Sequence, residues 1–411
     1  MMRVNGDRLL SDLRQLANFG RFKTGVDRVA LSPADLEARH WLMQRMGEAG
    51  LEPHMDEVAN VYGRDPRAKR ALMIGSHTDT VPRGGWLDGA LGVMYGLEIA
   101  RAARDSGDAS SVGIDVMSFQ DEEGTYVAFL GSRVFCNDLA AAEIDGARSS
   151  GVSLRSVLAH VPPAKNPLRI DIARHVCYLE AHIEQGPRLE QAGRRIGIVT
   201  AIVGIRRFRI HTSGQADHAG TTPMANRRDA GAALLRLGAQ VARELPALGG
   251  KDTLWNIGSI AFRPGAPNVV PNEAEMVLEF RDTDPAILDK LERELRNWVE
   301  ESNRGACPTE IETMALITPF PLAHNLAGVL ASSAKARGED PVYMASGAGH
   351  DAMVMGRYMP AAMLFVPSIG GRSHDITEDT DEADIRRGLR VFARTVNSLL
   401  EALGPDGTGA L

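Results

Sequence analysis

The chain has 411 residues, of which 44% are hydrophobic and 24% are charged, and its formal net charge is -7. This composition is typical of a globular protein with a large core, and the length favours two domains over one. The negative balance argues against a nucleic-acid or acidic-membrane partner. Three scattered cysteines, Cys136, Cys177 and Cys307, suit a reducing compartment.

The first residues, Met1 to Leu16, are mixed and polar, unlike the basic start and apolar core of a secretory signal. No apolar run approaches the roughly 20 residues that a membrane span requires. We therefore expect a soluble, cytoplasmic protein.

The first long helix is predicted at Ser32-Pro33, where a capping serine precedes proline, and it runs to about Ala49. Further helices are predicted at Gly92–Arg104 and, shorter, at Ser132–Leu139. Four apolar runs between and after them indicate buried strands: Ala71–Gly75, Ile114–Phe119, Val176–Ala181 and Ala361–Pro367. This alternation predicts an α/β fold with a mainly parallel sheet flanked by helices.

The pattern changes near residue 206. The predicted elements that follow are the strands and helices Arg206–Thr212, Arg227–Arg243, Trp255–Phe262, Glu275–Arg281, Pro285–Asn303 and Glu310–Leu316. Their order, βαββαβ, is that of a self-contained ferredoxin-like unit. We expect an inserted domain at 207–317 between two parts of one α/β domain, 1–206 and 318–411, which resumes with helices near Asn325–Gly338 and Glu382–Leu403.

Residues with metal-ligand side chains follow each of the four strand runs. They are His77 and Asp79, Glu122 and Glu123, His182, and His374, with Asp88 on a glycine-rich loop after the first. In open α/β sheets, ligands bind just beyond the carboxyl ends of the strands. Imidazole and carboxylate donors suit zinc, manganese, cobalt or nickel, and the spacing does not choose among these metals.

Each cluster also has an ordinary interpretation, because a lone loop histidine is usually solvated and Asp-Gly is usually a turn. Their conjunction at four strand ends favours a site for a divalent metal. The adjacent Glu122 and Glu123 would point in different directions on an extended segment. That arrangement suits one ligand and one general base, and the spacing does not assign the two roles.

Three segments together resemble a known family. The segment Gly75–Val93, with His77-Thr-Asp79 and Asp88-Gly, is similar to the first metal motif of the M20-type metallopeptidases. The strings His182-Ile-Glu-Gln-Gly-Pro187 and Asp217-His-Ala-Gly-Thr-Thr-Pro-Met224 resemble its hydantoinase/carbamoylase branch of N-carbamoyl-L-amino-acid hydrolases, β-ureidopropionases and allantoate amidohydrolases. The resemblance covers nearly the whole chain and implies a metallopeptidase-like catalytic domain with an inserted lid and dimerisation domain.

Carried over residue by residue, the resemblance implies two divalent metal ions per subunit. The implied ligands are His77 and His182 for the first ion, Glu123 and His374 for the second, and Asp88 as the bridge between them. Glu122 would be the general base. Asp79 would hydrogen-bond His77 and orient its ring.

The resemblance also implies a clamp for a small anionic substrate. Arg281 would bind the substrate carboxylate with its guanidinium fork, and Asn268 and Gln185 would hydrogen-bond the substrate. His218 would stabilise the oxyanion from the partner subunit of a homodimer. Because Arg281 and His218 both fall in the inserted domain, closure of that domain would complete the site.

Some positions depart from the family pattern or carry weaker assignments. Glu279 stands where the family often has aspartate, which leaves Arg281 intact. The segment from His374 to Glu378 places further polar side chains near the metal. His350 and Asp351 receive a supporting or structural role only.

The expected reaction is hydrolysis of the carbamoyl (ureido) C–N bond of an N-carbamoyl-L-amino acid or a related ureido acid, which releases an amine, carbon dioxide and ammonia. The nearest alternative is allantoate amidohydrolase. Further alternatives are an amino-acid deacylase or dipeptidase, and a binding protein with a vestigial site. The last is disfavoured because all five ligands and Glu122 are present.

Overall fold

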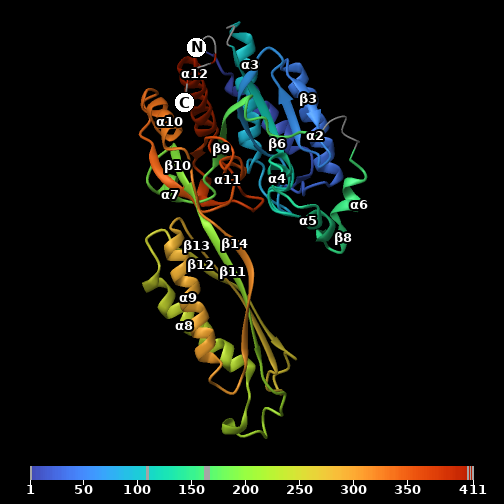
Figure 1. The fold of residues 1–411 in the computed structure, drawn as a ribbon, viewed down its shortest axis with the longest axis vertical. Helices are drawn as coiled ribbons and strands as arrows, with labels where there is room; N and C mark the ends of the chain where they lie inside the picture. Colours follow the sequence, from blue (N-terminus) through green and yellow to red (C-terminus); the bar gives the residue numbers. More distant parts are fainter. Residues whose placement is uncertain (1, 108–110, 162–166, 405–406, 408, 410–411) are drawn as a thin grey trace. The chain divides into compact units, whose positions relative to one another are not determined.

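The computed structural model describes residues 2–107, 111–161, 167–404, 407 and 409 (Figure 1). The chain forms two compact units: Met1–Thr200 together with Leu322–Leu411, and Ala201–Pro321. Among the described residues, no helix has the length and apolar character needed to cross a membrane.

The larger unit is built on a sheet with the strand order β15-β10-β17-β9-β5-β6-β4-β3, and β16 pairs with β10. Its central strands are β17 (Ala361–Val366), β9 (His175–Ile183), β5 (Arg70–His77) and β6 (Val112–Phe119). These four are parallel to one another. The flanking strands are β15 (Phe320–Pro321), β10 (Gly197–Ile202), β16 (Val342–Ser346), β4 (Val61–Arg64) and β3 (Glu52–Met55). The prediction of a mainly parallel sheet is confirmed at this centre.

Both faces of the central sheet are buried, and alternate side chains enter different cores. Leu72 and Leu179 join the core formed with α3 (Ala90–Asp105), as expected from the two-residue period of a strand. On the opposite face, Phe119 packs against Tyr178, with ring centroids 6.1 Å apart. Covering both faces explains why the four strands are continuous apolar runs in the sequence.

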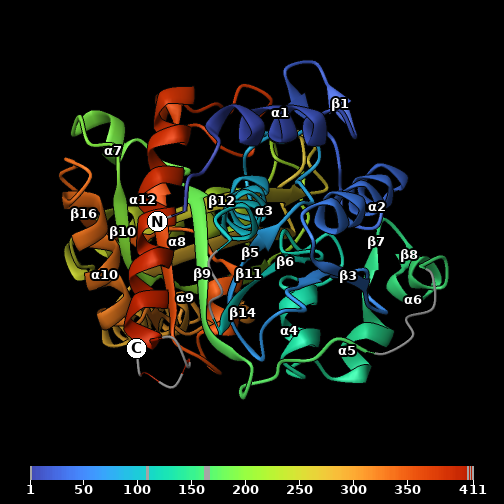
Figure 2. The same ribbon diagram turned by 90° about the horizontal axis from the view of Figure 1, so that it is seen from above.

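The helices that cover the larger unit differ in length and position. The long ones are α1 (Gly6–Ala17), α2 (Pro33–Glu48), α3, α10 (His324–Lys335) and α12 (Glu382–Leu403). Helix α1 packs on both α3 and α12 (Figure 2). The short ones are α4 (Leu130–Phe135), α5 (Ala141–Gly146), α6 (Leu154–Leu158), α7 (Arg188–Gln191) and α11 (Asp351–Met355).

The predicted helix at Ser32-Pro33 is confirmed, and the Ser32 side chain accepts a hydrogen bond from the Asp35 amide. The shorter helix predicted at 132–139 begins and ends earlier in the structure. Helix α4 runs from Leu130 to Phe135, and Asn137 adopts a left-handed φ of 56° that does not continue it. The short pairs β1 (Arg21–Phe22) with β2 (Gly25–Val26), and β7 (Arg148–Ser149) with β8 (Val152–Ser153), were not predicted. A two-residue strand does not repeat the two-residue period of a strand, so it gives no detectable alternation.

The smaller unit has the predicted βαββαβ order. Its elements are β11 (Gly204–Ser213), α8 (Ala230–Leu248), β12 (Leu254–Arg263), β13 (Glu273–Asp282), α9 (Pro285–Ser302) and β14 (Thr309–Ile317). The strands form an antiparallel sheet in the order β12-β13-β11-β14. Along β13, buried and half-buried residues alternate strictly, so one face packs against α8 and α9. Helix α8 begins later than predicted because Asp229 caps it through the Ala232 amide.

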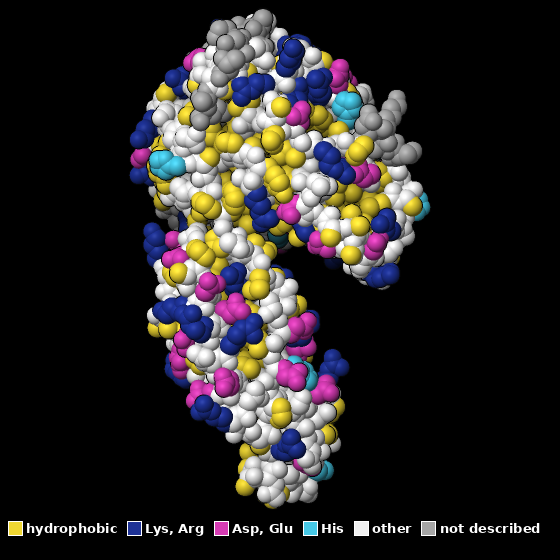
Figure 3. Space-filling view, in the orientation of Figure 1, with side chains coloured by type: hydrophobic (Ala, Val, Ile, Leu, Met, Phe, Trp, Pro, Cys, Tyr) yellow, Lys and Arg dark blue, Asp and Glu magenta, His cyan; other side chains and the backbone are white. Residues whose placement is uncertain are grey.

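The surface of the smaller unit carries both signs of charge. On the face drawn in Figure 3, basic and acidic side chains are interspersed. Exposed ion pairs such as Arg209–Glu312, with 2.7 Å between Nη1 and Oε2, contribute to this mixture.

Candidate metal centre

The carboxyl ends of the four parallel strands carry the residues that the sequence analysis singled out. His77 is the last residue of β5, His182 lies at the end of β9, and the pair Glu122 and Glu123 follows β6. Asp88 occupies the loop between β5 and α3, and its side chain is 4% exposed. Since parallel strands end at the same edge of a sheet, these side chains meet.

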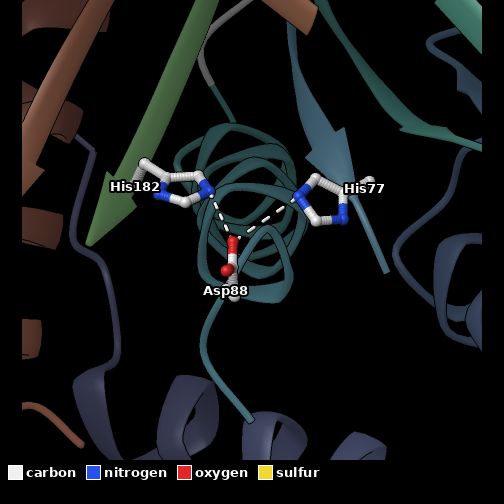
Figure 4. Close-up of side chains that lie close together, drawn as sticks. All are labelled: His77, Asp88 and His182. Carbon is white, nitrogen blue, oxygen red and sulfur yellow. Dashed lines mark ion pairs between the residues drawn. The ribbon is translucent and has the colours of Figure 1, made fainter. Parts of the chain in front are cut away.

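The first group of donors is His77, Asp88 and His182 (Figure 4). Asp88 Oδ1 lies 3.0 Å from His182 Nε2 and 3.7 Å from His77 Nε2. Figure 4 shows the two rings extending from β9 and β5, with the Asp88 carboxylate between them. All three residues are buried.

Hydrogen bonds to main-chain carbonyls fix the orientation of both rings. His77 Nδ1 lies 3.0 Å from the Asp79 carbonyl oxygen, and His182 Nδ1 lies 2.8 Å from that of Ile183. A carbonyl oxygen can only accept, so each Nδ1 carries a proton and the neutral ring presents a lone pair at Nε2. This is the tautomer that binds a metal through Nε2.

The second group is Asp88, Glu123 and His374. His374 Nε2 lies 3.3 Å from Asp88 Oδ2 and 3.4 Å from Glu123 Oε1. The two carboxylate oxygens of Asp88 therefore face different groups. The carboxylates of Asp88 and Glu123 raise the pKa of His374 to about 11, against the opposing effect of burial.

These residues fit divalent metal ions. Glu123 Oε1 is buried, and no hydrogen-bond partner with suitable geometry is found for it among the described residues. His374 Nε2, at 3.4 Å, offers this oxygen an ion pair only when that ring is protonated, and a buried carboxylate oxygen without a hydrogen bond is costly unless a cation neutralises it. Burial lowers the pKa of His182, but the hydrogen bond and charge of Asp88 outweigh it and raise that pKa to about 9. A cation would displace this proton, as metal ions displace protons from their ligands.

Glu122 and Glu123 have different nearest histidines, although both can contribute an oxygen to one group with His77. Glu122 Oε2 lies 3.6 Å from His77 Nε2, whereas Glu123 faces His374. Burial, followed by the negative charges of Glu123, Asp351 and Asp88, raises the pKa of Glu122 well above its usual range. Nearby cations would offset that repulsion.

Asp79 supports the site through its main chain and its carboxylate separately. Its carbonyl accepts the His77 hydrogen bond, while Oδ1 lies 3.9 Å from His77 Nδ1. The carboxylate instead accepts hydrogen bonds from the amides of Asp121, at 3.1 Å, and Glu123, at 3.4 Å. It thereby links the loop after β5 to the loop after β6.

Gln185 lies beside the second group. Its Nε2 donates to Asp88 Oδ2 over 2.8 Å and lies 3.5 Å from His374 Nε2. Its Oε1 is buried and has no hydrogen-bond partner in the described part of the chain. This oxygen is therefore available to a donor that enters the site.

A further buried polar cluster lies next to His182. The His350 ring packs edge-on against it, with centroids 4.6 Å apart, and His350 Nε2 is 2.8 Å from Ser346 Oγ. Glu180 also belongs to this group, and its Oε1 accepts from Ser76 Oγ over 2.6 Å. No role was predicted for Glu180, because an acidic residue inside an apolar strand carries no motif of its own.

The predicted substrate residues outside this unit lie in the smaller one. His218 and Asn268 are neighbours, since the amide of Ala219 donates to the Asn268 carbonyl over 2.9 Å. Both side chains are exposed. Arg281 lies on β13, and its Nε donates to Glu279 Oε1 over 2.7 Å.

Sequence comparison adds to this geometry. Residues 73–398 match the sequence profile described as peptidase family M20/M25/M40. The chain is 32% identical to the N-carbamoyl-L-amino-acid amidohydrolase of Paenarthrobacter aurescens, over 97% of this chain and 99% of that protein. It is also 32% identical to the allantoate amidohydrolase of Escherichia coli strain K12, over 92% of this chain and 94% of that protein.

Structural comparison leads to the same group of proteins. The crystal structure of an amidase of the hydantoinase/carbamoylase family from Burkholderia phymatum superposes with a TM-score of 0.89. The two chains are 44% identical, and the match covers 98% of this chain and 99% of the other.

Proposed function

The chain belongs to peptidase family M20/M25/M40, and on that premise we propose that it is a metal-dependent amidohydrolase acting on ureido acids. The substrate is an N-carbamoyl-L-amino acid or a related small anionic ureido acid. Hydrolysis of its carbamoyl C–N bond releases the amine and carbamate, which breaks down to carbon dioxide and ammonia. The names of the N-carbamoyl-L-amino-acid and allantoate amidohydrolases that it resembles support this substrate class.

One observation carries the proposal of two metal ions. Asp88 faces the two histidines of the first group with Oδ1 and His374 with Oδ2. His77 and His182 would hold the first ion, Glu123 and His374 the second, and Asp88 both. Zinc, manganese, cobalt and nickel all accept this mixed nitrogen and oxygen donor set.

The ions, when bound, would lower the pKa of a water molecule and polarise the ureido carbonyl. Glu122 is the general base: its Oε2 takes a proton from the attacking water as the new C–O bond forms. The same carboxyl then gives that proton to the amino nitrogen as the C–N bond breaks.

We further propose a clamp for the substrate. Arg281 binds its carboxylate, Asn268 and Gln185 hydrogen-bond it, and His218 of a second subunit stabilises the oxyanion. In this proposal, 207–317 is the inserted lid and dimerisation domain of a cytoplasmic homodimer, and 1–206 with 318–411 form the catalytic domain. The unpartnered Oε1 of Gln185 supports its part in the clamp.

The decisive experiment is an ammonia-release assay on chelator-treated enzyme resupplied with Zn²⁺, Mn²⁺, Co²⁺ or Ni²⁺. N-carbamoyl-L-amino acids, N-carbamoyl-β-alanine and allantoate form the substrate panel. We expect metal-dependent ammonia release from at least one of them. Preference for allantoate would select the second candidate function, which the Escherichia coli relative favours.

Two results would contradict the proposal. Cleavage of acyl-amino acids or dipeptides alone would make the protein a deacylase or dipeptidase. Binding of a ureido acid without turnover under any of the four metals would make it a binding protein.

A further inference from the structure

Glu378 joins two segments that are far apart in the sequence and that carry different proposed ligands. Its side chain is buried, with 2% of the residue exposed. Its Oε1 accepts hydrogen bonds from the main-chain amides of Leu87 and Asp88, each over 3.0 Å. The carboxylate of Glu378 therefore fixes the backbone from which the Asp88 side chain extends.

The other oxygen of Glu378 reaches the same aspartate by a second route. Ser373 Oγ lies 2.7 Å from Glu378 Oε2 and 3.0 Å from Asp88 Oδ2. Ser373 immediately precedes His374, whose backbone is held at a left-handed φ of 56°. The Glu378 carboxylate thus accepts from the main-chain amide of Asp88 and contacts Ser373. Ser373 in turn touches the Asp88 side chain and precedes His374.

The loop after β5 is shaped to admit this carboxylate. A Cβ atom at Gly85 would come within 1.9 Å of the Glu378 carboxyl group. Any side chain at this position would displace Glu378, because atoms cannot approach so closely. The absence of a side chain at Gly85 is therefore a requirement of the Glu378 contacts.

The charge of Glu378 has no basic neighbour to offset it. In the described ranges, no lysine, arginine or histidine forms an ion pair with it, and its hydrogen-bond partners are two amides and one hydroxyl. A glutamine could accept from the same amides through Oε1, but its Nε2 is a donor and could not accept the Ser373 hydroxyl in place of Oε2. Burying a carboxylate in this way is costly unless positive charge is nearby. Cations held by Asp88 would supply that charge.

We propose that Glu378 is a positioning residue that holds Asp88 and the His374 segment in the arrangement that binds the second metal ion. This inference rests on the proposed two-metal function. The first ion would keep His77 and His182, whose rings are oriented by the Asp79 and Ile183 carbonyls. The second ion depends on Asp88, Glu123 and His374, so loss of Glu378 lowers the affinity for the second ion more than the affinity for the first.

The test is calorimetric titration of metal-stripped full-length protein with Mn²⁺ alone. We expect the wild type to bind two ions, and Glu378→Gln to bind the second about 10- to 100-fold more weakly, the usual effect of losing a group that orients a ligand. Thermal melting of the metal-free proteins shows whether the variant is folded. Affinity for the first ion should change much less.

Glu98→Gln is the control for a buried glutamate, because Glu98 accepts a main-chain amide from Asn5 over 2.6 Å and, unlike Glu378, also pairs with Arg8 over 2.7 Å. It lies in α3 and contacts no proposed ligand, so it should lower thermal stability without changing the ratio of the two Mn²⁺ affinities. Ser373→Ala keeps both amide bonds to Glu378 and removes only the hydroxyl link. Ser373→Ala should lower the affinity for the second ion to a smaller extent. It replaces Glu378→Gln as the test variant if Glu378→Gln fails to fold.

The outcomes separate the two proposals. If the wild type binds only one Mn²⁺, the two-metal function is wrong. If it binds two, and Glu378→Gln or its substitute Ser373→Ala binds both as tightly as the wild type does, the positioning role is wrong. If Glu378→Gln lowers the affinities for both ions equally, and Glu98→Gln does the same, Glu378 contributes only to general stability and the positioning role is likewise wrong.

Discussion

Arg39 and Asp79 form an ion pair from which solvent is fully excluded, with 3.4 Å between Nη2 and Oδ1 and no exposure of either side chain. The same guanidinium pairs with Asp35 over 2.9 Å and donates to the Phe119 carbonyl over 3.0 Å. Because Asp79 in turn accepts the amides of Asp121 and Glu123, the loop that carries the glutamate pair is anchored to a residue of α2.

Replacing Arg39 with methionine should therefore lower the free energy of unfolding by about 3–5 kcal/mol, because two buried carboxylates lose their partner. Urea denaturation measures this loss. Arg296→Met is the matched control, since Arg296 pairs with Glu292 on the exposed side of α9 and is 43% exposed. That change should cost roughly 0.5 kcal/mol or less. Equal losses in both variants would show that the Arg39 network contributes no more than a surface pair.

The two adjacent glutamates should respond differently to the same substitution. Glu122→Gln should lower kcat by about 10²- to 10⁴-fold, the usual contribution of a general base, while Mn²⁺ content is unchanged. Glu123→Gln should instead reduce the amount of bound Mn²⁺. Ammonia release and metal analysis on the same preparations measure both effects. Near-normal activity of Glu122→Gln with full metal content would remove Glu122 from the base role.

Arg281→Lys should raise KM by roughly 10- to 100-fold for carboxylate substrates, because a lysine cannot replace the two-point contact of a guanidinium. The increase should be absent for a substrate analogue in which a carboxamide replaces the carboxylate. Arg209→Lys, on the neighbouring strand β11, provides the control and should leave KM unchanged. An equal rise in KM for the acid and the amide would mean that Arg281 maintains the fold and does not bind the substrate carboxylate.

A buried acid far from the metal residues gives a prediction for pH. Burial alone would raise the pKa of Asp115, but hydrogen bonds from His175, Arg174 and Tyr62 outweigh it and hold that pKa below its usual value. A lowered folded-state pKa stabilises the protein above the unfolded value of about 3.9, and this stability is lost as the pH falls through the folded-state value.

Asp115→Asn should accordingly cost about 3–5 kcal/mol near neutral pH, because Arg174 is left buried without its counter-charge. The difference from wild type should shrink as the pH drops below about 4. Urea unfolding at a series of pH values checks this. Asp145→Asn, which alters an exposed pair with Arg155, should show no such dependence. A pH-independent cost at Asp115 would mean that lost hydrogen bonds cause it, and not charge.

Sequence patterns were sufficient for the four central strands of the large sheet and for the residues that follow them, but not for its flanking strands β3, β4, β10, β15 and β16. The four apolar runs needed no tertiary information, because strands buried on both faces must be continuously apolar. The rule for strand ends then placed His77 and His182 on one edge, where the structure has them. The order of the smaller unit was equally clear, since its helices and strands are long enough to show their periods.

The supporting residues could not be found in this way. Arg39 lies in an ordinary helix and contacts residues 40 to 81 positions away. Glu378 contacts Asp88 across 290 positions, and nothing local marks it as buried. The hydrogen bond from His77 also goes to the carbonyl of Asp79, a choice that depends on loop geometry and not on residue type.

The position of β17 governs the order in which the protein can be assembled during synthesis. This strand lies between β9 and β10 in the sheet and pairs with Tyr178 and Gly197, yet it follows the whole of the smaller unit in the chain. Until a ribosome has made residues 361–366, β9 and β10 have no common neighbour, although the smaller unit can form its own core once residue 321 has been made. The facing edges of β9 and β10 therefore stay unpaired until Ala361–Val366 emerges. Chaperones that bind apolar strands would act in this interval.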